Sequence, residues 1–286
     1  MTRIVVLGDL NLDVHATHPD DLAPGSERRA SVRAVPGGSA GTFARIAAAD
    51  VAVTFVGCVG RDLVGDLLVR SLEIAGIEPF IARDDRPSGT ILALERGGER
   101  TMVCSRGAND GLVADRLDAD IFESADHLHI SGYAFLSPAQ RGAAQRAIAL
   151  AAARGITISV DPPPANLIAT FGVDAFLDEL ADVTWLFPNL SEGQLLTGRD
   201  RPEAIVERLA EAFAVGAVTL GATGALAWNR DERSHVSPPA VVSGNPTGAG
   251  DAFAGAFVAA TLAGVPLAEA NARACAAAAN HLQRDA

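Results

Sequence analysis

The 286-residue sequence contains little cysteine, and what it has is scattered. Its three cysteines, Cys58, Cys104 and Cys275, are odd in number and far apart. They form neither a disulfide framework nor the paired spacing of a metal site. We therefore expect three reduced thiols and a cytoplasmic location, because disulfides are rare in that compartment.

Basic residues are also in the minority. Lys and Arg number 23 against 35 Asp and Glu, which gives a formal net charge of -12. This balance argues against nucleic acid or an anionic membrane surface as the main partner. It does not exclude a phosphate-bearing ligand, because one local pocket can be positive on an acidic protein.

Long membrane-spanning or secretory segments are not evident either. The first apolar run, residues 4–7, is too short for a signal peptide and is followed at once by Gly8 and Asp9. The longer uncharged run after Asp251 is rich in Ala and Gly and contains Pro266. We interpret it as a helix of the protein core rather than a membrane span.

The sequence does contain enough apolar residues, 49%, to bury a large core. Residues 4–7 are continuously apolar, which is typical of a strand buried on both faces. Strand and helix patterns then alternate along the chain, which predicts one α/β domain over residues 1–286 with a mostly parallel sheet. The further predicted strands are 53–59, 127–131, 156–160, 183–187 and 217–220, and the predicted helices are one ending near 49, then 61–75, 138–154, 171–180, one ending at 198, and 203–213.

Two β-like runs, 88–95 and 100–105, interrupt this alternation. They flank Arg96-Gly97-Gly98-Glu99, a hairpin signal. Together with residues 26–35 they predict a small sheet outside the main layer, a lid formed by about 10–36 and 78–106. Exposed strand edges invite pairing with a second copy, so we also predict a homodimer through this lid.

A glycine-rich turn, Thr247-Gly248-Ala249-Gly250-Asp251, opens the long apolar helix. Residues 248–250 are small, so an anion can approach the free N–H groups of the helix start. Asp251 would repel a phosphate there, but it is well placed to take a proton from the group that attacks the phosphate. The alternative is an ordinary glycine turn followed by a favourable first-turn Asp.

Other candidate residues follow predicted strands, where open α/β sheets bind ligands. Asn11 and Asp13 follow the first strand, although a solvated turn would have the same composition. A second glycine turn, at residues 36–42, opens another helix. No G-x-G-x-x-G fingerprint follows the first strand, which disfavours a dinucleotide enzyme.

Two further strand ends carry polar or glycine-rich motifs. In Asn189-Leu190-Ser191-Glu192, Ser191 suits an N-cap and Glu192 a first turn; alternatively, Asn189 and Glu192 orient a hydrated Mg²⁺. Residues 219–224 form either a ligand-binding turn or a plain tight turn. His127 and His129 alternate on one strand without a metal-spaced partner, so we expect packing roles for them.

In this order, the five motifs resemble those of the ribokinase family, also called the PfkB carbohydrate kinases. The resemblance implies a sheet of about nine strands with a β lid, and ATP-dependent phosphorylation of a primary hydroxyl on a small sugar or sugar derivative. Its implied cofactors are ATP and Mg²⁺, with a monovalent cation such as K⁺ left open. The predicted site comprises Asp251 as general base with Gly248, Ala249 and Gly250 as anion hole; Asn11, Asp13, Gly37, Gly38, Ser39, Thr42 and Arg106 at the substrate; Asn189, Thr219, Gly221, Gly224 and Thr247 at ATP; and Glu192, through water and with Asn189, at the metal.

The sequence departs from the family pattern at several positions. Asn245-Pro246 stands where the family usually has Asp-Thr, which removes a charge from the Mg²⁺ network. Ser39 and Thr42 are shorter than the Lys and Asn of ribokinases, so we expect poor discrimination for ribose. The chain stops at Ala286, where many members continue, which leaves the K⁺ loop open.

Two alternatives differ in substrate or class. A nucleoside kinase of the same family would need an aromatic platform, which Phe43 and Phe80 could provide. A non-catalytic sugar-binding relative would agree with Asn245 but not with an intact Asp251. Arg100 and Arg106 either face an acidic or phosphorylated sugar or are surface charges of the hairpin.

Overall fold

The computed structural model describes residues 2–17, 25, 27, 29–96, 99–238 and 247–284, and for residues 96, 99, 100 and 284 it describes the backbone alone. The hairpin glycines Gly97 and Gly98 lie outside this part of the chain, as do Asn245 and Pro246. None of the helices within these ranges is both long and apolar enough to cross a bilayer.

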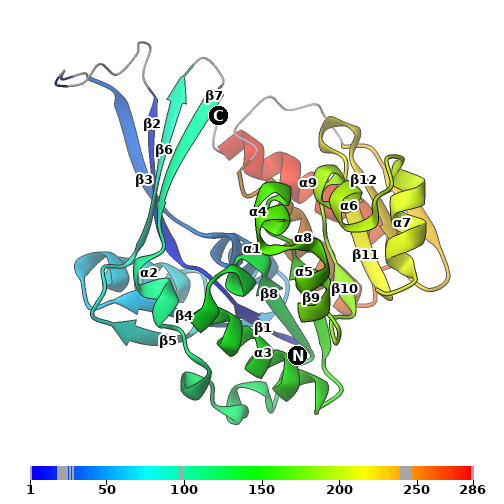
Figure 1. Ribbon diagram of the computed structural model, residues 1–286, viewed down its shortest axis with the longest axis horizontal. Coiled ribbons are helices and arrows are strands. Elements are labelled where there is room, and N and C mark those ends of the chain that lie inside the picture. Colours follow the sequence, from blue (N-terminus) through cyan, green and yellow to red (C-terminus); the bar gives the residue numbers. More distant parts are fainter. Residues whose placement is uncertain are drawn as a thin grey trace.

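A nine-stranded sheet forms the centre of the protein, in the order β13-β12-β11-β10-β9-β8-β1-β4-β5 (Figure 1). The strands from β11 to β5 are parallel, as predicted, and β12 and β13 are antiparallel. Sequence analysis did not predict this last hairpin, because its strands are four residues long and β13 is largely polar. The strands are β1 (Arg3–Leu7), β4 (Ala52–Gly60), β5 (Glu78–Asp84), β8 (His127–Ser131), β9 (Thr157–Asp161), β10 (Trp185–Leu186), β11 (Val215–Thr219), β12 (Ala225–Trp228) and β13 (Arg233–Val236).

Helices cover both faces of this sheet because its strands are apolar on both. In β1, Val5 and Leu7 pack into one core cluster, and Ile4 and Val6 pack into the other. The first cluster lies under α3 (Pro138–Ala152), α4 (Ala165–Phe171), α5 (Val173–Glu179), α6 (Leu190–Thr197) and α7 (Pro202–Ala210). The second lies under α1 (Ser39–Ala47), α2 (Leu63–Ile74), α8 (Ala249–Leu262) and α9 (Leu267–Arg284).

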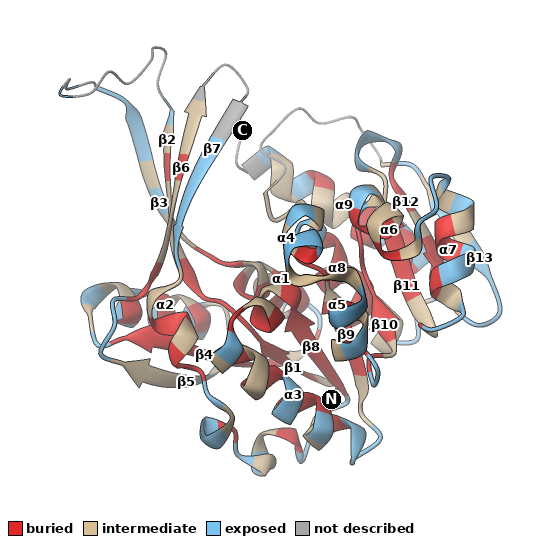
Figure 2. Ribbon diagram, in the orientation of Figure 1, coloured by how far each residue is buried: buried red, intermediate tan, exposed pale blue. Residues whose placement is uncertain are grey.

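The predicted lid is a separate four-stranded sheet that stands away from the main body at the upper left of Figure 1. Its order is β3 (Ser31–Gly37), β2 (Asn11–Thr17), β6 (Gly89–Arg96) and β7 (Glu99–Ser105). Figure 2 shows the difference in burial: the inner strands of the main sheet are mostly buried, whereas β3 is exposed or half-buried except at Gly37, and residues 101–105 of β7 are exposed. Sequence analysis extended the lid back to residue 78, but β5 pairs in parallel with β4 in the main sheet.

Two predicted elements differ from the structure. The helix expected over 171–180 is α5, which starts after Gly172, whose φ of 104° an L-residue rarely adopts; the short helix α4 that precedes it was not predicted. The final helix α9 was not predicted, although its apolar and polar residues fall on different faces.

Candidate active site

Helix α8 begins as the sequence predicts, at Ala249 after the glycine turn. Gly248 is its N-cap, with φ of 77°, and no side chain caps the helix. A Cβ at Gly248 would lie 2.7 Å from His281 Nε2, so both backbone conformation and space require glycine. Within the part of the chain that the structure describes, no capping side chain bonds the first N–H groups of α8, which is what an anion-binding helix start requires.

Asp251 lies in the first turn of α8 and is bonded by residues from two other elements. Ser39 Oγ, in the first turn of α1, donates to Asp251 Oδ1 at 2.5 Å, and Ser131 Oγ donates to Ser39 Oγ at 2.9 Å. The two helices approach closely because Gly255 has no side chain: a Cβ there would lie 2.7 Å from the carbonyl oxygen of Phe43. Packing of α1 on α8 therefore holds Ser39 against the carboxylate.

A second carboxyl group, Asp161, also contacts Asp251. It stands at the end of β9, is hydrogen-bonded to Asp251, and has a pKa raised well above the ordinary value by burial and by the negative charge of Asp251. Burial raises the pKa of Asp251 too, whereas the bonds from Ser39 and Asp161 lower it. Asp161 therefore holds a proton and donates it, and Asp251 is the acceptor.

Sequence analysis missed Asp161 because it ended the strand at Val160. A polar residue directly after a buried apolar run was the available signal, the same one that identified Asn11 and Asp13.

Glu192 lies beside this pair, at the start of α6. Burial raises its pKa to about 7, with a contribution from the charge of Asp251. Asn189, not Ser191 as expected, is the N-cap: its side chain accepts from Glu192 N at 3.0 Å. Asn189 N and Nδ2 in turn donate to the two Glu192 oxygens at 2.8 and 2.6 Å, which completes a capping box.

The three carboxyl groups of Asp161, Asp251 and Glu192 are the candidate ligands for the predicted Mg²⁺. Among the residues that the structure describes, no three His, Cys, Asp or Glu side chains are placed to bind a metal ion directly. Both Glu192 oxygens already accept hydrogen bonds from Asn189, yet each keeps a free lone-pair direction. The donor set therefore fits a hydrated Mg²⁺ held through water, since oxygen ligands and retained waters are what Mg²⁺ prefers.

The predicted substrate residues on β2 lie at the base of the lid. Asp13 accepts a backbone bond from Gly38, and burial raises its pKa to about 6. Its other oxygen, Oδ1, is buried and has no hydrogen-bond partner in the described structure. Gly37 makes room for this carboxylate, because a Cβ there would overlap it. An unpartnered buried oxygen is costly, so this atom is placed to bind a ligand hydroxyl.

Asn11 is held by a residue that sequence analysis did not select. Asn109 Nδ2 donates to Asn11 Oδ1 at 2.7 Å, and Asn109 Oδ1 accepts from Leu10 N at 3.0 Å. Asn109 is fully buried. It fixes the orientation of the Asn11 amide and leaves its Nδ2 group available to a ligand.

Arg106 is already bonded by the protein. Its guanidinium donates to Asp9 at 2.9 and 3.3 Å, to Asp110 at 2.8 Å and to Gln140 at 2.5 Å. A ligand would have to compete with these groups, so substrate binding by Arg106 stays a prediction. The side chain of Arg100 lies outside the described residues.

The predicted ATP residues lie at the ends of β11 and before α8. Thr219 pairs with Asn189 across a β-bridge, which places the end of β11 beside the start of α6. Gly224 accepts a bond from Leu220 N at 2.7 Å and closes the turn around Gly221. Thr247 directly precedes Gly248, and its carbonyl oxygen lies 3.0 Å from His281 Nε2.

The remaining selected residues lie around α1 or in the core. Thr42 lies against Gly248: a Cβ at that glycine would be 3.4 Å from Thr42 Cγ2. Phe43 is fully buried and stacks on His129 with ring centroids 3.5 Å apart, so it is no platform for a base. Phe80 lies on the edge strand β5.

Both His127 and His129 are buried and burial lowers their pKa values, in agreement with packing roles.

Comparison with known proteins identifies relatives of the same architecture. The model of the family described as "pfkB family carbohydrate kinase" matches residues 1–285. An ATP-dependent ribose-1-phosphate kinase from Halopiger xanaduensis is 30% identical over 275 residues, which cover 91% of this chain and 84% of the relative.

Solved structures agree with this match. An Escherichia coli protein assigned as a ribokinase II, in complex with ATP and Mg²⁺, superposes with a TM-score of 0.88 at 24% identity, covering 99% of this chain and 93% of that one. Adenosine kinase from Sinorhizobium meliloti superposes with a TM-score of 0.88 at 21% identity, covering 99% and 94%. At these identities the two superpositions establish the shared fold.

Proposed function

The chain belongs to the PfkB family of carbohydrate kinases, and we propose that it transfers the γ-phosphate of ATP to a primary hydroxyl of a small sugar or sugar derivative, with Asp251 as general base. The observation that supports this proposal most strongly is the environment of the Asp251 carboxylate. An acceptor carboxylate stands one turn inside a helix whose first N–H groups are uncapped, and Ser39 and Asp161 donate to it.

The substrate is bound by the base of the lid in this proposal. Asp13 Oδ1 accepts a hydrogen bond from one sugar hydroxyl and so gains the partner that it lacks in the free protein. The Asn11 Nδ2 group donates a hydrogen bond to another hydroxyl. The primary hydroxyl then lies against Asp251. Ser39, held by Ser131, keeps the carboxylate oriented toward it.

Proton transfer follows from the state of the carboxyl pair. Because Asp161 keeps the shared proton, Asp251 remains an anion that can accept the hydroxyl proton as the oxygen attacks phosphorus. The backbone N–H groups of residues 248–250 stabilise the charge that spreads over the phosphoryl oxygens. Mg²⁺, held through water by Glu192 with Asn189, would neutralise phosphate charge, and Thr219, Gly221, Gly224 and Thr247 would line the nucleotide.

A coupled assay of ADP release tests the proposal. Sugars, sugar derivatives and nucleosides are each offered with ATP and Mg²⁺ to the wild type and to Asp251→Asn. We expect release with at least one sugar and its loss in the variant. Release only with nucleosides would reassign the substrate, and no acceptor-dependent release with any compound would support a binding protein instead.

A further inference from the structure

A hollow of about 550 Å³ lies along the edge strand β5, outside the site described above. In the main sheet, β8, β1 and β4 separate β5 from β9, which carries Asp161. Residues 79–82 form its apolar floor, and Arg61, Arg83 and Arg116 line its sides. Its volume lies within the roughly 300–1,000 Å³ of small-molecule sites. We call it the arginine hollow.

The charge of the arginine hollow is opposite to that of the protein. Three guanidinium groups line it, and no acidic residue is among the lining residues, although the whole chain carries a net charge of -12. They come from three separate elements: Arg61 precedes α2, Arg83 is in β5, and Arg116 ends a 3₁₀ helix, Ala114–Arg116. The fold therefore brings together cations that are distant in the sequence.

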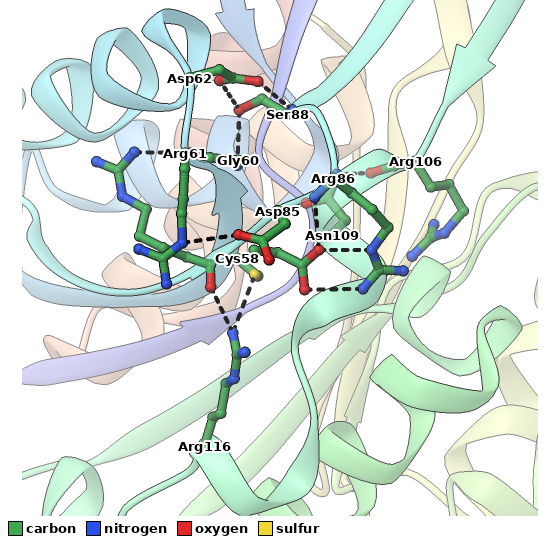
Figure 3. A network of polar contacts seen from close by, with 12 residues as sticks. Cys58, Gly60, Arg61, Asp62, Asp85, Arg86, Ser88, Arg106, Asn109 and Arg116 are labelled. Atoms are coloured by element: carbon green, nitrogen blue, oxygen red, sulfur yellow. Dashed lines mark hydrogen bonds and ion pairs between the residues drawn. The ribbon is translucent and has the colours of Figure 1, made fainter.

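Arg61 and Arg83 pair with exposed carboxylates, and Arg116 lies near Asp84, whose ion pair is with Arg86. Arg61 pairs with Asp85 at 3.2 Å and Arg83 with Asp66 at 2.8 Å, but those carboxylate side chains are 98% and 68% exposed. Exposed ion pairs contribute little to stability, so a ligand can displace them at little cost. Arg116 donates to the carbonyl of Arg83 at 3.1 Å and points toward Cys58 Sγ (Figure 3).

The floor supplies an apolar contact. The Phe80 side chain is 39% exposed, and the other floor residues, 79, 81 and 82, are apolar as well. A guanidinium group can donate two parallel hydrogen bonds to the oxygens of a phosphate. A ring of the ligand can also stack on the exposed face of an aromatic side chain. We propose that the arginine hollow binds a small organic phosphate, with its phosphate held by Arg61, Arg83 and Arg116 and its apolar or planar part on Phe80.

The arginine hollow is joined to the lid by two hydrogen bonds. Arg83 Nη1 donates to the carbonyl of Gly60 at 2.9 Å, and Gly60 N donates to Ser88 Oγ at 2.9 Å. Ser88 directly precedes lid strand β6, and Asp62 also holds it (Figure 3). These bonds connect Arg83 to the base of the lid through Gly60.

Calorimetry with phenyl phosphate tests the site, with AMPPNP at saturation so that the nucleotide site is filled. We expect saturable binding to the wild type and at least tenfold weaker binding to Arg116→Ala. Phe80→Ala should weaken phenyl phosphate but leave inorganic phosphate unchanged. Arg70→Ala is the matched control: it removes the same charge from neighbouring α2, where Arg70 pairs with Glu73 outside the hollow. Thermal unfolding of each variant verifies that it is folded.

Two outcomes would overturn the proposal: no phenyl phosphate binding at millimolar concentration, or equal affinity in the wild type and Arg116→Ala. AMP and ribose 5-phosphate then distinguish the source of the phosphate. Tighter AMP indicates a nucleotide, and tighter ribose 5-phosphate indicates a sugar phosphate.

Discussion

Helices α8 and α6 both begin beside Asp251, but they begin in different ways. Helix α8 starts at a glycine in the left-handed region, and no side chain caps it. Helix α6 starts at Asn189, whose capping box with Glu192 satisfies its backbone groups. The backbone N–H groups of the first start are open to a ligand, whereas those of the second that take part in the capping box are bonded by its own side chains.

Helix α1 follows the first pattern. It starts at Gly38, whose φ is 91°, and Gly38 provides no side-chain cap. The N–H group of Gly38 donates a hydrogen bond to the Asp13 carboxylate. The two open starts thus belong to the helices that carry Ser39 and Asp251, and they face the carboxylates to which we assign chemistry. Helix α5 also starts at an uncapped glycine, Gly172, so it is the carboxylates beside α1 and α8, and not the uncapped start alone, that mark the candidate site.

The largest expected effect follows from removing the base at the open start. Asp251→Asn keeps the acceptor for Ser39 but cannot take a proton, so kcat should fall by about 10²–10⁴. ATP affinity should stay equal or tighten, because a negative charge near the phosphates is gone. Steady-state kinetics and calorimetry measure both, with exposed Asp50→Asn as control. Near-normal kcat would remove Asp251 from the mechanism.

A smaller effect is expected from adding one methyl group at the open start. Gly248→Ala forces an L-residue to φ 77° and places Cβ against His281, which we expect to cost about 1–3 kcal/mol of stability and to weaken ATP binding. Gly264→Ala is the matched control, since φ is 76° there but no atom lies within 4 Å of the added Cβ. Equal ATP affinity in the two variants would show that the α8 start does not contact the nucleotide.

The start of α1 makes a prediction about pH. The folded pKa of Asp13 is about 6 against an ordinary 3.8, so the native state binds this proton more tightly and stability falls as pH rises from 4 through 6. Asp13→Asn should therefore be more stable than the wild type at pH 8, by about 1–3 kcal/mol, and equal to it at pH 4. The sugar KM should rise. Urea unfolding at both pH values measures the stability; parallel curves would contradict the assignment.

The closed start should show the smallest effect. Asn189→Ala removes the cap of α6 and should lower stability by about 1 kcal/mol, with Asn189→Ser restoring most of it. Denaturant unfolding measures both variants. If Asn189→Ala left the stability unchanged, α6 would not depend on its cap, and the comparison would fail.

Elements with strong patterns were predictable. The continuous apolar run of β1 and the glycine turn before α8 were located from local residue types alone. Asp161 could have been selected as the polar residue that follows β9, but its bond to Asp251, like that of Asn109 to Asn11, could not be predicted because the partners are distant in the sequence. Ser39 also bonds Asp251 and Gly37 makes room for Asp13, contacts that only the packed fold creates.

The connection between β1 and β2 has a mechanical consequence. Only residues 8–10 separate β1, an inner strand of the main sheet, from β2, an inner strand of the lid, and Gly8 lies close to Ala40 and Ser131. Asn11 and Asp13 lie on β2, yet Asn109 and Gly38 of the main body hold their side chains. A sugar bound to these two residues would therefore contact the joint between the two sheets, and it would favour one lid orientation only to the extent that it binds that orientation more tightly.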